Sequence, residues 1–245
     1  AAEGFGKLAA AVGENLGTPE QKVYTGTVGQ LAASHFESLS VLLVEAAQVP
    51  SRRTQGLPDE AFARGKVPMT KQEVRAAVLA KLGVQPGELL WDVGAGTGSV
   101  SVELALAAPR GRVYAVECDP EACALIRQNK EKFAVRNLTL VEGTAPAALE
   151  NLPAPDAVFI GGTKGNLAAV VEAALARNPA ARICISAIAL ETLSAAVAAL
   201  TAHGLQAEVC QISVSRAKAA GKLHLLMANN PIFLITRADE AEKSV

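Results

Sequence analysis

Three glycines at alternate positions, Gly94, Gly96 and Gly98, follow a short apolar run near the middle of the chain. Residues 89–93 predict a buried strand, and residues 99–108 predict a helix that begins directly after the glycines. A turn without Cβ atoms lets the main chain approach a bound molecule closely, and the free amides at the start of the helix favour polar or anionic groups. The chain is therefore restricted to folds in which a strand, a turn and a helix together form a ligand site.

An acidic residue stands at the distance expected for ribose binding. Glu117 ends the next apolar run, about twenty residues beyond the glycine turn, where a carboxylate can accept hydrogen bonds from a ribose diol. The dinucleotide pattern G-x-G-x-x-G is not met, because Ser99 occupies the position of the third glycine. Counted from Asp92, the pattern is D-x-G-x-G-x-G, the form used by S-adenosylmethionine-dependent methyltransferases. The spacing favours S-adenosylmethionine as the cofactor and disfavours NAD.

Strands and helices alternate beyond the first seventy residues or so. We expect strands at 89–93, 112–117, 138–141, 156–160 and 181–186, and helices at 99–108, 120–133, 145–151, 165–177 and 189–203. Repeated β-α units indicate a parallel sheet with helices on both faces. Residues 205–215 and 231–237 predict two more strands, with no full helix between them, that pair as an antiparallel hairpin at the edge. The expected fold is α/β, a Rossmann-like class I methyltransferase fold with a mostly parallel seven-stranded sheet and an antiparallel C-terminal edge strand.

The first part of the chain has a different organisation. Residues 1–48 predict an Ala-rich helix, a glycine-containing turn, a second helix over 28–36 and a strand at 39–44. Fewer than fifty residues do not readily bury an independent core. Residues 49–67, with several prolines and glycines, predict a linker, so the main domain is expected to span 68–245. Thr70 and Glu73 have the spacing of a capping box at the start of its first helix.

Composition excludes several classes of function. The formal net charge is −1, so no overall field draws the chain to nucleic acid or to an anionic membrane. No apolar stretch of the sequence reaches the length of a membrane span. The four cysteines and three histidines are scattered without the spacing of a metal site. We therefore expect free thiols, no bound metal and a cytoplasmic location.

Ligands of open parallel sheets bind beyond the carboxyl ends of the strands. The residues at these ends are the expected cofactor contacts, namely Asp92, Gly94, Ala95, Gly96, Thr97, Gly98, Glu117, Cys118, Thr144 and Ala145. Gly161 and Gly162 follow the strand at 156–160 and leave room for a bulky substrate beside the methyl group. Enzymes that methylate exocyclic amines tend to carry an Asn/Asp-Pro-Pro-aromatic motif at this place. A glycine pair offers an amino group no acceptor, so we expect another kind of substrate.

Several segments outside the glycine turn carry a more specific resemblance. They are residues 68–75, Glu103, residues 159–162, residues 187–191 and residues 214–216. Together with the turn they resemble the C15-methyltransferase (decarboxylating) domain of the precorrin-6Y C5,15-methyltransferase family, which acts in cobalamin biosynthesis. This resemblance extends from about Pro68 to Arg237.

The beginning of the chain carries a second resemblance. Residues 13–20 and the strand that ends at Val44 resemble the C-terminal end of the C5-methylating tetrapyrrole methylase domain. In bifunctional forms that domain comes first. The resemblance thus implies that residues 1–48 are the remnant of a fused C5-methylase domain and that the chain is a C-terminal piece without C5 activity.

The family resemblance implies a substrate and two reactions. The substrate is a ring-contracted tetrapyrrole of the precorrin-6B type that bears several acetate and propionate groups. S-adenosylmethionine methylates its C15, S-adenosylhomocysteine is the product, and the acetate on C12 leaves as CO2. The resemblance also implies a homotetramer, and it places Thr70 against the cofactor. Neither a nucleic-acid nor a membrane partner is expected.

A polycarboxylate substrate requires cations, and arginine gives the better bidentate contact. The expected substrate-binding residues are Arg75, Gly161, Gly162, Lys164, Ser186 and Lys218, and the expected catalytic residues are Glu103, Arg216 and His224. Structural roles are open for all three catalytic candidates. Glu103 could form a structural hydrogen bond on its helix, Arg216 could be a solvated surface charge, and His224 could support a strand.

Other functions remain as alternatives at this stage. A methyltransferase of the same fold that acts on RNA or protein would require a basic face or a target motif after the fourth strand, and the sequence contains neither. A non-catalytic binding module would not require an intact cofactor motif. The leading hypothesis is therefore a C-methyltransferase that acts on a precorrin.

Overall fold

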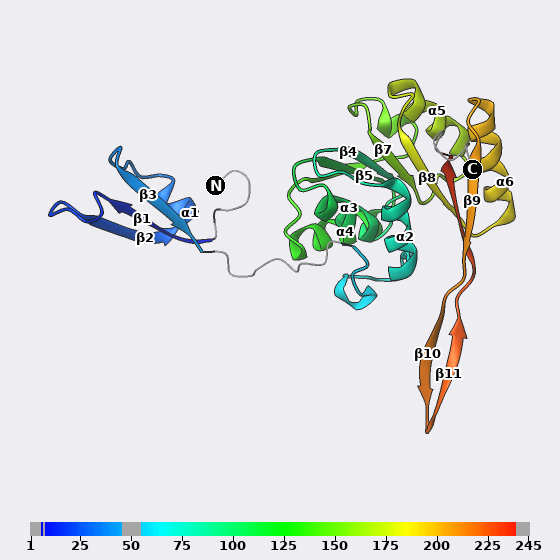
Figure 1. The fold of residues 1–245 in the computed structure, drawn as a ribbon, viewed down its shortest axis with the longest axis horizontal. Coiled ribbons are helices and arrows are strands. Elements are labelled where there is room, and N and C mark those ends of the chain that lie inside the picture. The colour runs from blue at the N-terminus through cyan, green and yellow to red at the C-terminus, as the bar shows by residue number, and fades with distance from the viewer. Residues whose placement is uncertain (1–5, 7, 46–54, 239–245) are drawn as a thin grey trace, which may run out of the picture. The chain divides into compact units, whose positions relative to one another are not determined.

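The computed structural model describes residue 6 and residues 8–45 and 55–238 (Figure 1). The chain divides into two compact units, Ala1–Arg52 and Arg53–Val245. Residues 46–54 lie outside the described residues, so the first part of the predicted linker has no structural test. The same holds for residues 239–245 of the predicted main domain. The two units are described separately.

The smaller unit is a three-stranded antiparallel sheet of order β2-β1-β3 with one helical turn. Its elements are β1 (Ala9–Glu14), β2 (Lys22–Thr27), α1 (Val28–Leu31) and β3 (Ser40–Val44). The prediction of an Ala-rich helix at the start is wrong, because β1 is the central strand and pairs on both sides. Tertiary pairing here overrides the helix preference of alanine. The second predicted helix is a single turn, whereas the strand at 39–44 is confirmed.

The larger unit is an α/β fold in which strands and helices alternate. Its elements are η2 (Asp59–Ala61), α2 (Gln72–Leu82), β4 (Leu89–Val93), α3 (Ser99–Ala107), β5 (Arg112–Glu117), α4 (Pro120–Lys132), β6 (Leu138–Glu142), η3 (Ala147–Leu149), β7 (Ala157–Ile160), α5 (Leu167–Arg177), β8 (Arg182–Ala187), α6 (Leu190–Ala202), β9 (Ala207–Ile212), β10 (Ser215–Ala220), β11 (Leu223–Ala228) and β12 (Ile232–Arg237). The predicted strands and most predicted helices are confirmed. The predicted helix over 145–151 is only the short 3₁₀ turn η3.

The seven-stranded sheet has the order β6-β5-β4-β7-β8-β12-β9. Strands β4 to β8 pair in parallel. Strand β12 is antiparallel to both β8 and β9, so the antiparallel strand lies one place in from the edge. The strand order reverses at β4, which has β5 on one side and β7 on the other. This reversal is where open sheets bind ligands, and the glycine turn follows β4 directly.

Helices lie on both faces of this sheet (Figure 1), and an apolar core fills the space on each face. On one face, side chains of α2, α3 and α4 pack against residues such as Leu90 and Phe159. On the other face, α5 and α6 pack against residues such as Trp91 and Ile183. Consecutive residues of a strand point to opposite faces, so a continuous apolar run such as Ala157–Ile160 supplies both cores. The sheet is thereby fixed from both sides, and its carboxyl edge becomes a rigid support.

The segment before α2 belongs to the larger unit and is not a linker. Leu57 and Phe62, which lie within the predicted linker, are buried in the core on the α2 side. Thr70 does not cap α2, which begins at Gln72 with Lys71 as the N-cap residue. Instead, the Gln72 amide donates to Asp59 Oδ1 at 2.9 Å. A carboxylate 13 residues earlier thus replaces the predicted local cap.

A hairpin that the sequence analysis missed interrupts the last two strands of the sheet. Strands β10 and β11 pair antiparallel, with Arg216 opposite Met227 and Ala220 opposite Leu223. We call residues 215–228 the arm, because they project away from the sheet at the ends of β9 and β12 (Figure 1). The arm exposes several large apolar side chains, namely Leu223, Leu225, Leu226 and Met227. Among the described residues, no helix is both long and apolar enough to cross a bilayer.

Candidate active site

A pocket of about 1040 Å³ lies at the carboxyl ends of the parallel strands. Its volume is at the upper end of the range for ligand sites. Most of the residues that the sequence analysis expected at the site line this pocket, namely Thr70, Gly94, Ala95, Gly96, Thr97, Glu117, Cys118, Thr144, Ala145, Gly161, Gly162, Lys164 and Ser186. The other expected residues, which do not line it, are Asp92, Gly98, Arg75, Glu103, Arg216, Lys218 and His224.

The glycine turn needs its glycines for more than one reason. Gly94 has φ of +73°. A Cβ on Gly94 would lie 2.2 Å from the carbonyl oxygen of Gly162, so this glycine allows the turns after β4 and β7 to touch. Gly96 has φ of +56°, and a Cβ there would lie 3.2 Å from the carbonyl oxygen of Pro68. Gly98 packs against Ile126 of α4 instead of facing the pocket. Only the first part of the turn is therefore free for a ligand.

Glu117 is held in place at the end of β5 by main-chain amides. Its Oε2 accepts from the Gly96 amide at 2.9 Å, and its Oε1 accepts from the amides of Cys118 at 2.7 Å and Asp119 at 2.9 Å. An ionised carboxylate has about four acceptor positions, so roughly one stays free, on Oε2. The carboxylate lines the pocket beside the glycine turn and can accept a hydrogen bond from a ligand hydroxyl there.

Asp92 lies beneath the turn and not on the pocket surface. Its side chain is fully buried, and Ser101 donates a hydrogen bond to its Oδ2. Burial raises the pKa of Asp92 to about 7, the Ser101 hydrogen bond opposes this rise, and the nearby charge of Glu117 adds to it. Asp92 Oδ1 and the buried hydroxyl of Thr97 have no hydrogen-bond partner within the described structure. The predicted direct contact between Asp92 and a cofactor is therefore not supported by its position.

Three lysines stand around the pocket, and two of them were missed. Lys66 and Lys71 come from the segment before α2, and Lys164 comes from the turn after β7. The neighbouring Cys118 and the carboxylates of Glu117 and Asp119 raise the pKa of Lys164, which is therefore charged at neutral pH. The signal for Lys71 was its place next to Thr70, whereas nothing in the pattern around Lys66 marked it.

Residues that follow β8 in the chain also line the pocket, and several of them are apolar. Ile188 follows β8 and is 63% exposed although it lines the pocket. Ile212 and Val214 at one foot of the arm, and Asn229 and Asn230 at the other, also line it. The pocket thus combines bare main chain, a fixed carboxylate, lysine cations and apolar side chains.

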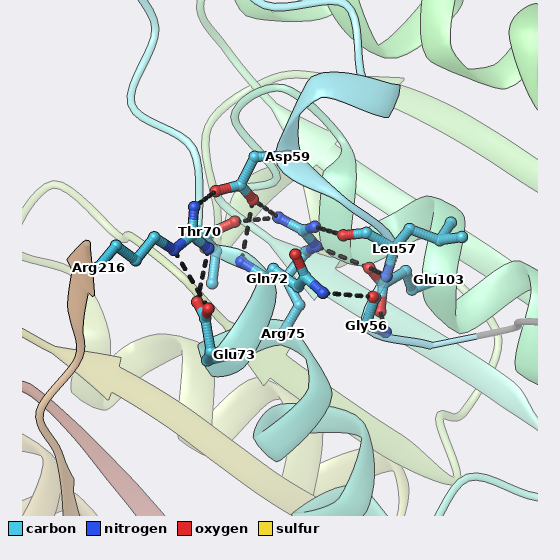
Figure 2. Close-up of polar contacts among 9 residues, drawn as sticks. All are labelled: Gly56, Leu57, Asp59, Thr70, Gln72, Glu73, Arg75, Glu103 and Arg216. Atoms are coloured by element: carbon cyan, nitrogen blue, oxygen red, sulfur yellow. Dashed lines mark hydrogen bonds and ion pairs between the residues drawn. The ribbon is translucent and has the colours of Figure 1, made fainter. Parts of the chain in front are cut away.

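Arg75 and Glu103 form a buried ion pair (Figure 2), and neither residue lines the pocket. Arg75 Nε donates to Glu103 Oε1 at 2.7 Å, and neither side chain is exposed. Arg75 also donates to Asp59 and to the carbonyls of Leu57 and Thr70. Their predicted roles, substrate binding for Arg75 and catalysis for Glu103, do not fit these positions. Both side chains are engaged in fixing the segment before α2, which the sequence alone could not reveal because their partners are distant in the chain.

Arg216 is engaged in the same network from the arm (Figure 2). Its Nε donates to Glu73 Oε1 at 3.2 Å and its Nη2 donates to Glu73 Oε2 at 2.7 Å. Its Nη1 donates to Asp59 Oδ2 at 3.0 Å. The hydrogen bond from Arg216 lowers the pKa of Glu73. Lys218 and His224 lie farther along the arm and are exposed. None of the three side chains lines the pocket, so the predicted direct contacts with substrate are not supported by this geometry.

Comparison with known proteins identifies a family that shares this architecture. The family model for the precorrin methyltransferase domain matches residues 60–237. A probable cobalt-precorrin-6B C(15)-methyltransferase (decarboxylating) from Pyrobaculum calidifontis is 47% identical over 186 residues, which cover 75% of this chain and 95% of that protein. A precorrin-6Y C(5,15)-methyltransferase [decarboxylating] from Sinorhizobium is 41% identical over 70% of this chain, and the match covers 42% of that longer protein.

A solved structure agrees with these sequence matches. The crystal structure of a precorrin-6y C5,15-methyltransferase from Geobacter metallireducens superposes with a TM-score of 0.74 at 40% identity, over 78% of this chain and 100% of that one. The larger unit therefore has the Rossmann-like fold of class I S-adenosylmethionine-dependent methyltransferases, as expected. On these grounds the chain belongs to the precorrin methyltransferase family.

Proposed function

We propose that this protein methylates C15 of a precorrin of the 6B type and removes CO2 from the acetate on C12, with S-adenosylmethionine as the methyl donor. The observation that carries the proposal is that one pocket is lined by the glycine turn, the fixed carboxylate of Glu117 and the Gly161–Gly162 turn. The names of the similar proteins support the same pair of reactions.

The residues around the turn fit an adenosyl cofactor. Glu117 would accept a hydrogen bond from the ribose, and the turn between Gly143 and Ala145 would face the adenine. The main chain at Gly94 to Gly96, which lacks Cβ atoms at both glycines, would accommodate the methionine part. When bound, this cofactor supplies a methyl group on a sulfonium, with a neutral thioether as the leaving group. Its binding energy depends on the Glu117 carboxylate staying oriented, which the three amides ensure.

The outer part of the pocket suits a large polycarboxylate. Gly161 and Gly162 are exposed and carry no side chain, so a flat macrocycle can approach the turn after β7. Lys66, Lys71 and Lys164 can pair with the acetate and propionate groups, and lysines allow the long, adjustable contacts that several flexible carboxylates need. Ser186 at the end of β8 can donate a further hydrogen bond.

Catalysis in this pocket would consist mainly of alignment and exclusion of water. The accepting carbon belongs to an electron-rich conjugated macrocycle and requires little help from a base. Residues that hold the macrocycle and the cofactor in line therefore supply most of the rate enhancement. Loss of CO2 leaves an electron pair that the macrocycle can delocalise, so the protein must orient the acetate and allow one proton to reach carbon. The lysine ammonium groups at the pocket can do both.

The deciding experiment follows mass. The protein is incubated with a precorrin of the 6B type and with S-adenosylmethionine that carries a labelled methyl group. The product should contain one labelled methyl group more and one CO2 less than the substrate. The matched control is Gly96→Val, which keeps all polar groups of the site and blocks the turn. An unchanged substrate mass with the unmodified protein would refute the proposal.

We further infer that the protein assembles as a homotetramer and that residues 1–48 are the remnant of a C5-methylase domain. Leu226, which is 75% exposed on the arm, and Leu43, which is 68% exposed on β3, support contacts with further protein surface. The sedimentation of the Leu226→Asp variant tests the first inference. A smaller assembly than that of the unmodified protein is expected, and an unchanged tetramer would show that the arm is not the contact.

A further inference from the structure

One wall of the pocket, next to Gly96 of the glycine turn, is made by the end of a segment that we call the strap, residues 56–71. Its last part, Lys66 to Lys71, lines the pocket. The carbonyl oxygen of Pro68 lies close enough to Gly96 that a Cβ there would be 3.2 Å away. The position of the strap thus sets the width of the space beside the glycine turn, where the proposed cofactor would bind.

Two buried anchors hold the strap from inside. Asn129 of α4 accepts from the Ala63 amide at 2.7 Å and donates to the Ala63 carbonyl at 3.0 Å and the Thr97 carbonyl at 2.8 Å. The strap is thereby tied to the glycine turn itself. At the other end, Glu103 accepts from the amides of Gly56 at 2.7 Å and Leu57 at 3.1 Å.

The third anchor comes from the arm. Asp59, whose side chain is 2% exposed, accepts from Arg75 through Oδ1 and from Arg216 through Oδ2. Arg75 in turn donates to the carbonyl of Thr70, a residue that lines the pocket. Hydrogen bonds therefore run without interruption from the arm, through Asp59 and Arg75, to the pocket wall (Figure 2).

The charges of this network explain why Arg216 matters. Three carboxylates, those of Asp59, Glu73 and Glu103, share two guanidinium groups. Burial raises the pKa of Asp59, but the hydrogen bonds and charges of Arg75 and Arg216 outweigh it, so its pKa lies below the ordinary value. Without Arg216, one guanidinium would face three carboxylates, one of them at the first turn of α2. Repulsion would then separate the strap from the start of α2.

We propose that Arg216 is a positioning residue that holds the strap closed over the cofactor site and so couples the arm to the pocket. This role differs from direct contact with substrate, because Nε, Nη1 and Nη2 of Arg216 all donate hydrogen bonds to Asp59 or Glu73. The expected effect on cofactor affinity rests on the proposed function. The expected effect on the strap applies to the unliganded protein and does not depend on that function.

The test compares Arg216→Met with a matched control, Arg182→Met. Arg182 has nearly the same side-chain exposure, 37% against 39%, and pairs with one carboxylate, Glu88, at the opposite end of the sheet. Calorimetry with S-adenosylhomocysteine, without substrate, should show binding about tenfold weaker for Arg216→Met, within the usual range of coupling between sites. Arg182→Met should bind within about twofold of the unmodified protein, and Arg216→Lys, which keeps the charge without the fork, should recover part of the loss.

Hydrogen exchange of the unliganded proteins provides the second readout. Amides of residues 57–71 should exchange faster in Arg216→Met than in the unmodified protein. In Arg182→Met their exchange rates should equal those of the unmodified protein. Equal cofactor affinity and equal exchange in all variants would overturn the inference, as would a change confined to the Michaelis constant of the substrate. If the unmodified protein itself does not bind S-adenosylhomocysteine, the proposed function fails, and the exchange rates still decide whether Arg216 holds the strap.

Discussion

The buried carboxyl group of Asp92 should make the stability of this protein fall as the pH rises. Its pKa is raised from the ordinary 3.8 to about 7, mainly because the side chain is removed from water. Well below pH 3.8 the group is protonated in both the folded and the unfolded chain. Above that pH the unfolded chain loses the proton first, so the folded state pays an increasing penalty until the pH exceeds about 7.

The magnitude follows from the two pKa values. One pKa unit corresponds to about 1.4 kcal/mol, so the total loss between acid and alkaline pH is about 4 kcal/mol. Between pH 5.5 and pH 8.5, the contribution of Asp92 lowers the free energy of unfolding by about 2 kcal/mol. Asp92→Asn keeps the size of the side chain and removes its titration. The free energy of unfolding of the variant should therefore lack this part of the pH dependence.

The assay is denaturant unfolding followed by fluorescence at a series of pH values. Trp91 is the one tryptophan of the chain and precedes Asp92 in β4, so its emission reports on the sheet of the larger unit. Ser101→Ala provides a second check, because loss of the hydrogen bond to Asp92 should raise the pKa further and extend the decline to higher pH. Parallel pH profiles for the unmodified protein and Asp92→Asn would refute the reasoning.

Three further predictions concern the site and its support. Glu117→Ala should weaken binding of S-adenosylhomocysteine by about 1–3 kcal/mol, the worth of a charge-assisted hydrogen bond, and calorimetry that finds unchanged affinity would remove Glu117 from the cofactor site. Gly96→Val should abolish that binding, because φ of +56° and the strap carbonyl oppose a branched side chain, while circular dichroism stays that of a folded protein; retained binding would show that the turn faces elsewhere. Arg75→Met should lower the free energy of unfolding by about 3–5 kcal/mol, since it leaves Asp59 and Glu103 buried without their shared cation, and a loss below about 1 kcal/mol would contradict this account.

The sequence predicted the larger unit well because its signals are local. Continuous apolar runs of the kind seen at Ala157–Ile160 indicate strands buried on both faces, and their alternation with helices leaves few topologies. The glycines and Glu117 lie at strand ends, so a correct strand prediction places them together without knowledge of side-chain contacts. For the same reason the lining of the pocket at the glycine turn was predicted more fully than the rest of its lining.

The errors arose where distant contacts decide the structure. Residues 9–14 are rich in alanine, and only pairing with strands on both sides makes them a strand. Asp59 was not considered, and its capping of α2 spans 13 residues with no sequence pattern. Arg75 and Arg216 were expected at the substrate because arginine suits carboxylates, and they do bind carboxylates, but those of the protein itself. Chemistry could be predicted for these side chains, whereas their partners could not.

The arm has a consequence for how such a protein can vary. Both of its feet, Val214 on one side and Asn229 on the other, belong to the rim of the pocket, whereas its tip at Gly221 and Lys222 is far along the hairpin from that rim. Residues added or exchanged at the tip would alter what the arm touches and leave the reacting groups where they are. Changes at the feet would reshape both at once. If the proposed assembly through the arm holds, selection on assembly and selection on chemistry can act on separate stretches of one short hairpin.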